Sequence, residues 1–413
     1  MRNNSFFKKT EILIGYVKWC LTGIFTGIIL GLVAGSFHHA VDFGAEIFSK
    51  YDFMLYLMPL AGIIIAAMYK YSNMENDLGT NFAILSLLKG ENIRLRTAPL
   101  IYISSVLTHI TGGSSGREGA ALQLGSSIGL YLGKLLKLDD KDIKIITMCG
   151  MSASFAALFG TPIAAAVFSM EIVGMGIIHY SCLVPCIISS VTGYFIAGFM
   201  GISPTFFQIS AMPEVTPLNI LRVIILSALT SLLSIVFCWC LHFSSHSFKK
   251  IKNIILRGFL GGVIVALITL IIGSRDYNGA GMNIIQQAIS GEAKPEAFIL
   301  KIILTAITLG AGFKGGEIVP SFFIGATFGC VAAPFIGLNS GFGAATGIAA
   351  IFCAVTNCPI ASIFLAAEIF GGKGMIFFAI ICATSYMLSG YTGLYGEQKR
   401  LYSKIKAVCL KES

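Results

Sequence analysis

The sequence predicts an all-α polytopic membrane protein, folded as a single transmembrane domain over residues 1–413. Hydrophobic residues make up 55% of the chain and charged residues 12%, whereas a soluble domain contains about 25% charged residues. Hydrophobic runs follow one another with only short breaks, and two parts of the chain resemble each other. Together these features indicate a repeat-built protein that lies in a bilayer.

Hydrophobic runs of two lengths define the expected helices. The longer runs are candidates for full spans, which need about 20 mostly apolar residues, and the first is too long for a signal-peptide core. The shorter runs are rich in glycine and are expected to be broken helices that meet inside the membrane. The expected spans are Ile12–Phe37, Phe53–Met68, Cys182–Met200, Leu221–Phe243, Leu256–Ile272, Phe298–Ala311 and Met375–Leu388, and the expected short helices are Gly119–Leu132, Ile146–Phe159, Ile163–Gly174 and Ile318–Cys330.

The chain repeats itself after about half its length. Thr161–Gly174 resembles Cys358–Gly371 at an offset of 197 residues, and Gly116–Gly129 resembles Gly316–Gly329 at an offset of 200 residues. We therefore expect two halves, about 12–200 and 215–395. The substrate site of such a protein is expected near the bilayer midplane, where the halves meet. The repeat pattern is compatible with either parallel or inverted halves.

Basic residues gather near both ends of the chain and around one short loop, the pattern of cytoplasmic flanks. This favours a multi-pass protein of the plasma membrane with short tails and both termini in the cytoplasm, and it accounts for the net charge of +9 without nucleic acid. The 11 cysteines follow no metal-site or disulfide spacing. The basic residues are Arg2, Lys8, Lys9, Lys249, Lys250, Lys252, Arg257, Lys399, Arg400, Lys404, Lys406 and Lys411.

Glu118 is the first candidate for a functional residue. It lies in the glycine-rich segment 112–119, ahead of a short apolar helix, and an ionisable residue at membrane depth is costly and usually functional. Glycines there would leave backbone N–H groups free at a helix start, an arrangement that binds anions. A carboxylate at this place would compete with a substrate anion and would let go when protonated, so that it acts as both gate and proton carrier. The alternative is a structural loop pair of Arg117 and Glu118 at the surface.

Other ionisable residues in the apolar segments are open to more than one interpretation. Glu317 begins the matching short helix of the second half, either beside the same cavity or as an N-terminal acid favoured by the helix dipole. Glu171 and Glu368 occupy equivalent repeat positions and are expected to have structural or interfacial roles. His109 is expected to be a hydrogen-bonded helix residue. No nucleophile–base pair, metal cluster or phosphate-binding loop stands out, so we expect no enzyme, no cofactor and no metal.

Three motifs resemble the CLC family of chloride channels and proton-coupled anion antiporters. They are Gly116-Arg-Glu-Gly, Gly160-Thr-Pro-Ile-Ala with its repeat, and Gly315-Gly-Glu-Ile-Val-Pro. The resemblance covers nearly the whole chain and implies two inverted repeats with many short, broken and tilted transmembrane helices. It also implies a homodimer with one anion path in each subunit, and Glu118 as the external gate. The chain ends soon after its last span, so we expect no C-terminal regulatory domain.

Departures from the chloride-type pattern favour one branch of this family. Ala120 follows the first motif where chloride-type members usually have proline, and Ile172 stands where chloride/proton exchangers carry an inner glutamate. Glu317 lies in a stretch where those members usually have no acid. Lys314–Thr327 is similar to the stretch found in fluoride/proton exchangers, and in that branch this glutamate takes part in proton coupling.

The resemblance also implies a set of anion-binding residues. Thr80 occupies the position of a serine in chloride-type members and commonly of methionine or asparagine in the fluoride branch, and its hydroxyl can donate to an anion. Tyr395 matches the central tyrosine of the family, with Tyr391 as the nearby competitor. Phe82 offers either a polarised ring edge or simple packing. The other residues expected around the anion are Asn81, Arg117, Gly119 and Val319.

These features predict an antiporter that exports fluoride in exchange for protons, with Glu118 and Glu317 in the proton path. A chloride/proton antiporter or a passive chloride channel on the same fold is the alternative, which Thr80 favours and which Glu317 and Ile172 disfavour. An intramembrane enzyme would need paired catalytic groups, and a structural scaffold would not need glutamates in glycine-rich breaks. The expected partners are fluoride or chloride, protons, the bilayer and a second copy of the chain.

Overall fold

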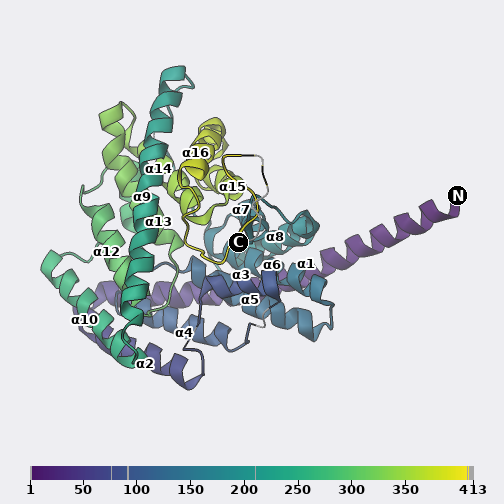
Figure 1. Ribbon diagram of the computed structural model, residues 1–413, viewed down its shortest axis with the longest axis horizontal. Helices are drawn as coiled ribbons and strands as arrows, with labels where there is room; N and C mark the ends of the chain where they lie inside the picture. Colours follow the sequence, from purple (N-terminus) through teal and green to yellow (C-terminus); the bar gives the residue numbers. More distant parts are fainter. Residues whose placement is uncertain (1, 76, 91–92, 210, 407, 409–413) are drawn as a thin grey trace.

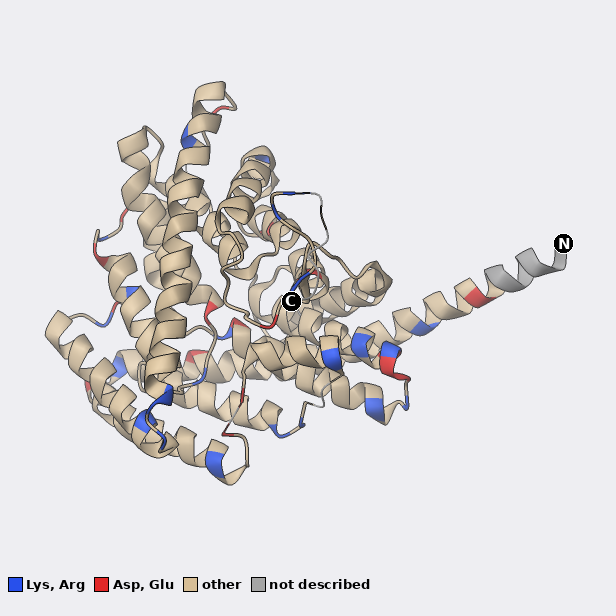
Figure 2. Ribbon diagram, in the orientation of Figure 1, with Lys and Arg blue, Asp and Glu red and all other residues tan. Residues whose placement is uncertain are grey.

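In the computed structural model the predicted all-α membrane fold is confirmed. Residues 2–75, 77–90, 93–209, 211–406 and 408 are described, with side chains from Thr10 onward. Seven helices in this part are long and apolar enough to cross a membrane, and charged residues are sparse along the helices (Figure 2). The α-helices are α1 (Arg2–Lys50), α2 (Met58–Tyr71), α3 (Thr80–Lys89), α4 (Thr97–Ile110), α5 (Glu118–Leu135), α6 (Asp140–Phe159), α7 (Pro162–Glu171), α8 (Leu183–Phe199), α9 (Pro217–Lys249), α10 (Ile254–Ile272), α11 (Met282–Ser290), α12 (Ala297–Gly310), α13 (Ile318–Ala332), α14 (Ser340–Thr356), α15 (Pro359–Phe370) and α16 (Met375–Leu388).

Some helices differ in length from the apolar runs that predicted them. The first run ends at Phe37, but α1 continues through polar residues to Lys50, and its N-terminal part projects beyond the rest of the molecule in Figure 1. The expected short helix Ile146–Phe159 is the apolar end of α6, which begins at Asp140 because Asp139 caps its first turn. Hydropathy located these helices but not their polar turns.

The two halves consist of matching helices. Helices α4, α5, α6 and α7 correspond in order to α12, α13, α14 and α15, and the two members of each pair differ by at most three residues in length. Within each half, glycines allow the second and third of these helices to touch. A Cβ atom built on Gly125 would lie 2.3 Å from the carbonyl oxygen of Gly150, and one built on Gly325 would lie 2.4 Å from that of Gly347. Both helix pairs therefore depend on glycine at the contact.

Two carboxylates exchange helix caps between the halves. Glu171, at the end of α7, accepts hydrogen bonds from the first turn of α15, and Glu368, on α15, accepts them from the first turn of α7. This exchange relates the halves by an approximate two-fold rotation and agrees with a structural role for both residues. The donors are the amides of Ile360 and Ala361 for Glu171, and of Ile163 and Ala164 for Glu368.

The segment after α16 returns from the second half to the first. Strand β2 (Lys399–Arg400) pairs in parallel with strand β1 (Gly174–Met175), which follows α7. Lys404 then donates to the side chain of Asn357 and to the carbonyl oxygen of Tyr386, at 2.5 and 2.8 Å. These contacts hold the segment that contains Tyr395 against the interior.

Candidate functional site

The two glycine-rich loops meet at a single point, called the crossing below. Gly116 and Gly316 form an isolated antiparallel bridge in which each backbone amide donates to the other residue's carbonyl, at 2.7 and 2.6 Å. A Cβ atom on Gly316 would lie 2.5 Å from the amide nitrogen of Gly119. The sequence needs glycine here because the two backbones are in direct contact.

Threonines from the opposite half hold each loop in place. The amide of Ser114 donates to Oγ1 of Thr308 at 3.2 Å, and the amide of Lys314 donates to Oγ1 of Thr108 at 3.3 Å. These two contacts are related by the 200-residue offset of the repeat. Thr305 adds a hydroxyl contact of 2.9 Å to Ser114. The crossing is thus fixed from both halves.

Three helix N-termini lie at the crossing. Helices α3, α5 and α13 begin there, and none has a side-chain hydrogen bond at its N-cap. Uncapped amides and the positive end of the helix dipole together make a site for negative charge. Four other helices are capped by the side chains of Asp139, Thr216, Asn253 and Asn339, whereas α2, α4, α8, α11, α12 and α16 also lack a side-chain hydrogen bond at the N-cap.

Glu118 is folded back onto the N-terminus of its own helix. Its buried carboxylate accepts a hydrogen bond of 3.0 Å from the amide of Arg117. The Arg117 guanidinium lies 3.7 Å from the other carboxylate oxygen, but its closer partner is Asp42 at 2.6 Å. Glu118 therefore occupies the donors that an anion would use, and it is not part of a surface ion pair.

One side of the crossing opens into a cavity of about 480 Å³, called the Glu118 cavity. Helix α1, the end of α4 and the loop between α10 and α11 form its walls, and the start of α11 closes one side. The charged or titratable residues on its lining are Asp42, His109, Arg117, Glu118, Arg275 and Asp276.

Glu317 lies beside the N-terminus of α5 but does not line the Glu118 cavity. A Cβ atom on Gly119 would be 3.0 Å from its carboxylate oxygen Oε2 and 3.4 Å from the hydroxyl of Thr80. Thr80 donates weakly to the carbonyl oxygen of Gly119 and accepts from the amide of Gln123, both at 3.4 Å. The two glutamates, from different halves, thus flank the first turn of α5.

Val319 and Tyr395 complete the set of predicted residues near the crossing. The side chain of Val319 would lie 3.1 Å from a Cβ atom on Gly116. The buried Tyr395 hydroxyl has no hydrogen-bond partner among the described residues. Tyr391 instead contacts Ser403 of the C-terminal segment. An orphan buried hydroxyl is a donor without an acceptor.

Two predicted residues lie away from the crossing. Asn81 accepts from the amide of Glu397 at 3.3 Å and lines a different cavity. The Phe82 ring packs against a small apolar cluster that includes Ile93 and Leu130. Packing, the second interpretation of Phe82, is what this structure contains.

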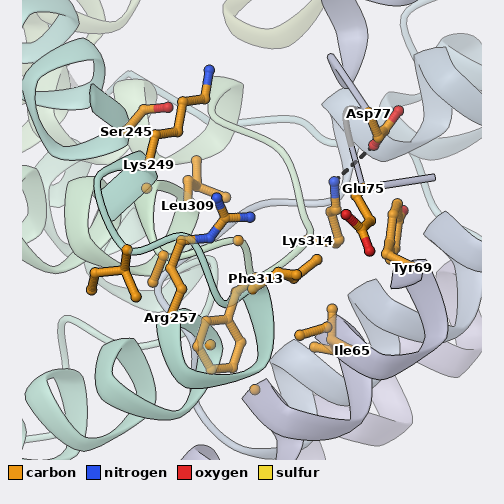
Figure 3. A pocket seen from close by; sticks show the side chains of 18 of the residues that line it. Ile65, Tyr69, Glu75, Asp77, Ser245, Lys249, Arg257, Leu309, Phe313 and Lys314 are labelled. Carbon is orange, nitrogen blue, oxygen red and sulfur yellow. Dashed lines mark hydrogen bonds and ion pairs between the residues drawn. The ribbon is translucent and has the colours of Figure 1, made fainter. Parts of the chain in front are cut away.

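The cavity beside Asn81 has a volume of about 620 Å³ and is called the Lys314 cavity. Figure 3 shows Lys314 bound to Asp77, at 2.7 Å, and its ammonium lies 4.1 Å from the centre of the Tyr69 ring. Arg257 and Lys249 also face this space (Figure 3). The two cavities are lined by different residues near the crossing. Asn81 and Lys314 line the Lys314 cavity, and Arg117 and Glu118 line the Glu118 cavity.

Sequence analysis missed several residues that build the site. Gln123 contacts Thr80, and its only sequence signal is an amide within an apolar helix. Asp42 pairs with Arg117 across 75 residues, a distance at which no local pattern exists. Lys301 is fully buried in α12, and a lysine inside an apolar run was a signal that could have found it. Groups of three or more potential metal ligands do not occur in the described part of the chain.

Comparison with known proteins gives relatives over nearly the whole chain. Residues 61–390 match the family model described as voltage gated chloride channel. A chloride/fluoride channel protein of Pseudomonas syringae pv. tomato is 31% identical over 405 residues, which cover 96% of this chain and 90% of that protein. An H(+)/Cl(−) exchange transporter of Yersinia pestis is 24% identical over 92% of this chain and 85% of that protein.

Solved structures share the fold. A CLC-type fluoride/proton antiporter superposes with a TM-score of 0.89 at 29% identity, covering 93% of this chain and 98% of that one. A slow cyanobacterial Cl−/H+ antiporter, at 19% identity, superposes with a TM-score of 0.75 over 90% of this chain and 94% of that one. The resemblance inferred from three motifs is confirmed, and the chain belongs to the CLC family of voltage-gated chloride channels.

Proposed function

We propose that this chain is a fluoride/proton antiporter in which Glu118 is the gate and carries the proton. The observation that carries the proposal is the Glu118 carboxylate lying on the uncapped N-terminus of α5, beside the N-termini of α3 and α13. An anion and this carboxylate compete for the same donors. Protonation of Glu118 frees the donors for fluoride, and release of fluoride lets the carboxylate return.

Glu317 passes the proton onward in this scheme. It lies beside the first turn of α5, close to Thr80, and is not on the lining of the Glu118 cavity. The Tyr395 hydroxyl lacks an acceptor in the described structure, so it is available to donate to an anion. Thr80 offers a second hydroxyl. Arg117, Gly119 and Val319 shape the donor side of the same space.

The orientation in the membrane follows from charge. Lys249, Lys252, Arg257 and Lys314 line the Lys314 cavity, and the positive-inside rule supports a cytoplasmic location for it. The Glu118 cavity then faces the outside of the cell membrane, and both termini are cytoplasmic. In this orientation inward proton flow drives fluoride export. The functional unit in this proposal is a homodimer of two such domains, each with halves at about 12–200 and 215–395.

The relatives of this chain support fluoride as the transported anion. The structure with 29% identity is a fluoride/proton antiporter, and the relative with 31% identity is named a chloride/fluoride channel protein. The second candidate is a chloride/proton antiporter or a passive chloride channel, which the hydroxyl of Thr80 favours.

Ion flux from liposomes tests the proposal. Purified protein is reconstituted in vesicles loaded with potassium fluoride or potassium chloride, and anion efflux and proton uptake are recorded with electrodes. We expect fluoride efflux with stoichiometric proton uptake and little chloride efflux. Chloride efflux as fast as fluoride efflux would move the protein to the chloride-type alternative, and efflux of either anion without protons would make it a channel.

A further inference from the structure

Lys301 is a buried cation that no part of the proposed mechanism uses. Its side chain lies within α12 with no exposed surface. The ammonium donates to the carbonyl oxygens of Tyr277 and Gly279, at 3.1 and 2.6 Å, and lies 4.9 Å from the centre of the Phe323 ring. Burial disfavours a charge at this place, and the carbonyl dipoles and the ring face offset that cost by stabilising the ammonium. No carboxylate among the described residues is paired with it.

Lys301 stands directly behind the wall of the Glu118 cavity. Gly279 and Gly281 line this cavity, and a Cβ atom on Gly281 would lie 3.6 Å from the Lys301 ammonium. The same loop is bound to the segment that precedes Glu118, because Asn278 donates to the carbonyl oxygen of Gly112 at 2.7 Å. The backbone of residues 279–281 thus separates the Lys301 ammonium from the Glu118 cavity.

The other charges around this cavity are compensated in pairs. Three ion pairs account for every charged residue on its lining except Glu118. In one of them, a hydrogen bond from Lys294 lowers the pKa of the Asp276 carboxyl, which keeps that partner ionised. The pairs are Arg117 with Asp42, Arg275 with Asp52, and Lys294 with Asp276.

Glu118 and Lys301 are thus the two charges that remain. With Glu118 ionised, the charges on the cavity lining, their ion-pair partners and Lys301 together balance to zero, and Glu317 is not on this lining. When Glu118 is protonated, the Lys301 charge is left over, and a single anion restores the balance. A fixed charge in a low-dielectric wall acts on an ion in the cavity far more strongly than an exposed charge does.

The first half has no such cation at the equivalent position. The residue 200 positions before Lys301 is Ile101. The same offset relates Thr308 to Thr108, which make equivalent contacts and so support this alignment. Ile101 is fully buried as well. A lysine is therefore not required to build this helix or its packing, and its presence only beside the Glu118 cavity points to a role there.

We propose that Lys301 is the fixed positive charge that draws the transported anion into the Glu118 cavity when Glu118 becomes neutral. The inference rests on the proposed anion transport but not on which halide is carried. Lys301 does not touch the anion; it acts through the Gly279–Gly281 wall.

Two substitutions separate this charge from the hydrogen bonds that it makes. Lys301→Gln can still donate to the carbonyl oxygens of Tyr277 and Gly279 but has no charge, whereas Lys301→Arg keeps the charge. Fluoride influx into liposomes, measured against external fluoride concentration, gives KM and kcat for each variant. We expect Lys301→Gln to raise KM by about tenfold at unchanged proton stoichiometry, and Lys301→Arg to remain within about threefold of the original protein.

Lys294→Gln is the matched control. It removes a lysine charge from the same region, but that side chain is 58% exposed, so water screens it and KM should change less than about twofold. A normal KM in Lys301→Gln would overturn the proposal and leave Lys301 as a brace for the loop. Equal KM increases in Lys301→Gln and Lys301→Arg would overturn it too. If the unmodified protein moves chloride instead, the same series is measured with chloride, so failure of the fluoride assignment remains distinguishable.

Discussion

The two glycine-rich loops are built alike but carry different charges. Each loop is bridged to the other through a glycine and held by a threonine of the opposite half. The offset of 200 residues aligns Arg117 with Glu317 and Glu118 with Ile318. At these aligned positions one loop therefore presents Arg117 followed by Glu118, whereas the other presents Glu317 followed by the apolar Ile318.

This difference indicates how a symmetric scaffold supports a directional process. Glu118 lines its cavity, whereas Glu317 lies beside the same helix turn without lining that cavity. Helix α3 reaches the crossing through Thr80, but its counterpart α11 begins in the wall of the Glu118 cavity. The backbone contacts repeat, whereas the titratable groups do not, so the two ends of the path are chemically distinct.

The largest expected effect comes from exchanging the two acids for amides. Glu118→Gln should abolish coupled proton movement, because a neutral amide neither takes up a proton nor loses one, so its binding to the donors of α5 no longer depends on protonation. Glu317→Gln should leave the anion site intact but slow proton transfer by about 100-fold. Proton uptake per anion, from paired electrodes on liposomes, measures both. Stoichiometric exchange in Glu118→Gln would remove it from the gate.

The glycines at the crossing should differ in their tolerance of alanine. In Gly316→Ala the new Cβ atom would meet the Gly119 backbone at 2.5 Å, and we expect a loss of about 2 kcal/mol or more of stability. In Gly116→Ala the nearest atom is the flexible end of Glu118, at 2.7 Å, so that variant should stay folded with slower transport. Thermal unfolding in detergent distinguishes them; equal melting temperatures would contradict this asymmetry.

The exchanged helix caps should contribute unequally to stability. Glu171 is buried and Glu368 is only partly buried, so loss of the first cap leaves its donors further from water. Glu171→Ala is expected to cost about 2 kcal/mol and Glu368→Ala about 1 kcal/mol, within the range of N-cap substitutions. Unfolding of both variants is compared with Glu171→Gln, whose amide oxygen still accepts. A larger cost for Glu368→Ala would reverse the comparison.

The smallest effect is expected at Thr80. Thr80→Val removes one hydroxyl from the crossing and leaves the Gln123 amide without its acceptor, at a cost of about 1 kcal/mol. The ratio of fluoride to chloride flux should change by about fivefold, whereas Thr80→Ser should preserve it. An unchanged ratio in both variants would show that this hydroxyl does not contact the anion.

Much of the site could be predicted because its chemistry is local. Glu118, its glycines and the following apolar helix are adjacent in the sequence, and the repeat marks the glycine-rich stretch that contains Glu317 as the matching segment. Asn81 and Phe82 were harder, since they follow Thr80 within the same helix turn but their side chains point away from the crossing. The direction in which each side chain points depends on where α3 docks.

By itself the sequence determined the membrane class, the order of the helices, the internal repeat and the main acidic residues, because composition and periodicity are properties of neighbouring positions. Only the tertiary structure decided which groups meet: the Gly116–Gly316 bridge, the caps exchanged by Glu171 and Glu368, and the Arg117–Asp42 pair. Each of these joins residues 75 or more positions apart. Such contacts depend on how the two halves dock, which no local pattern encodes.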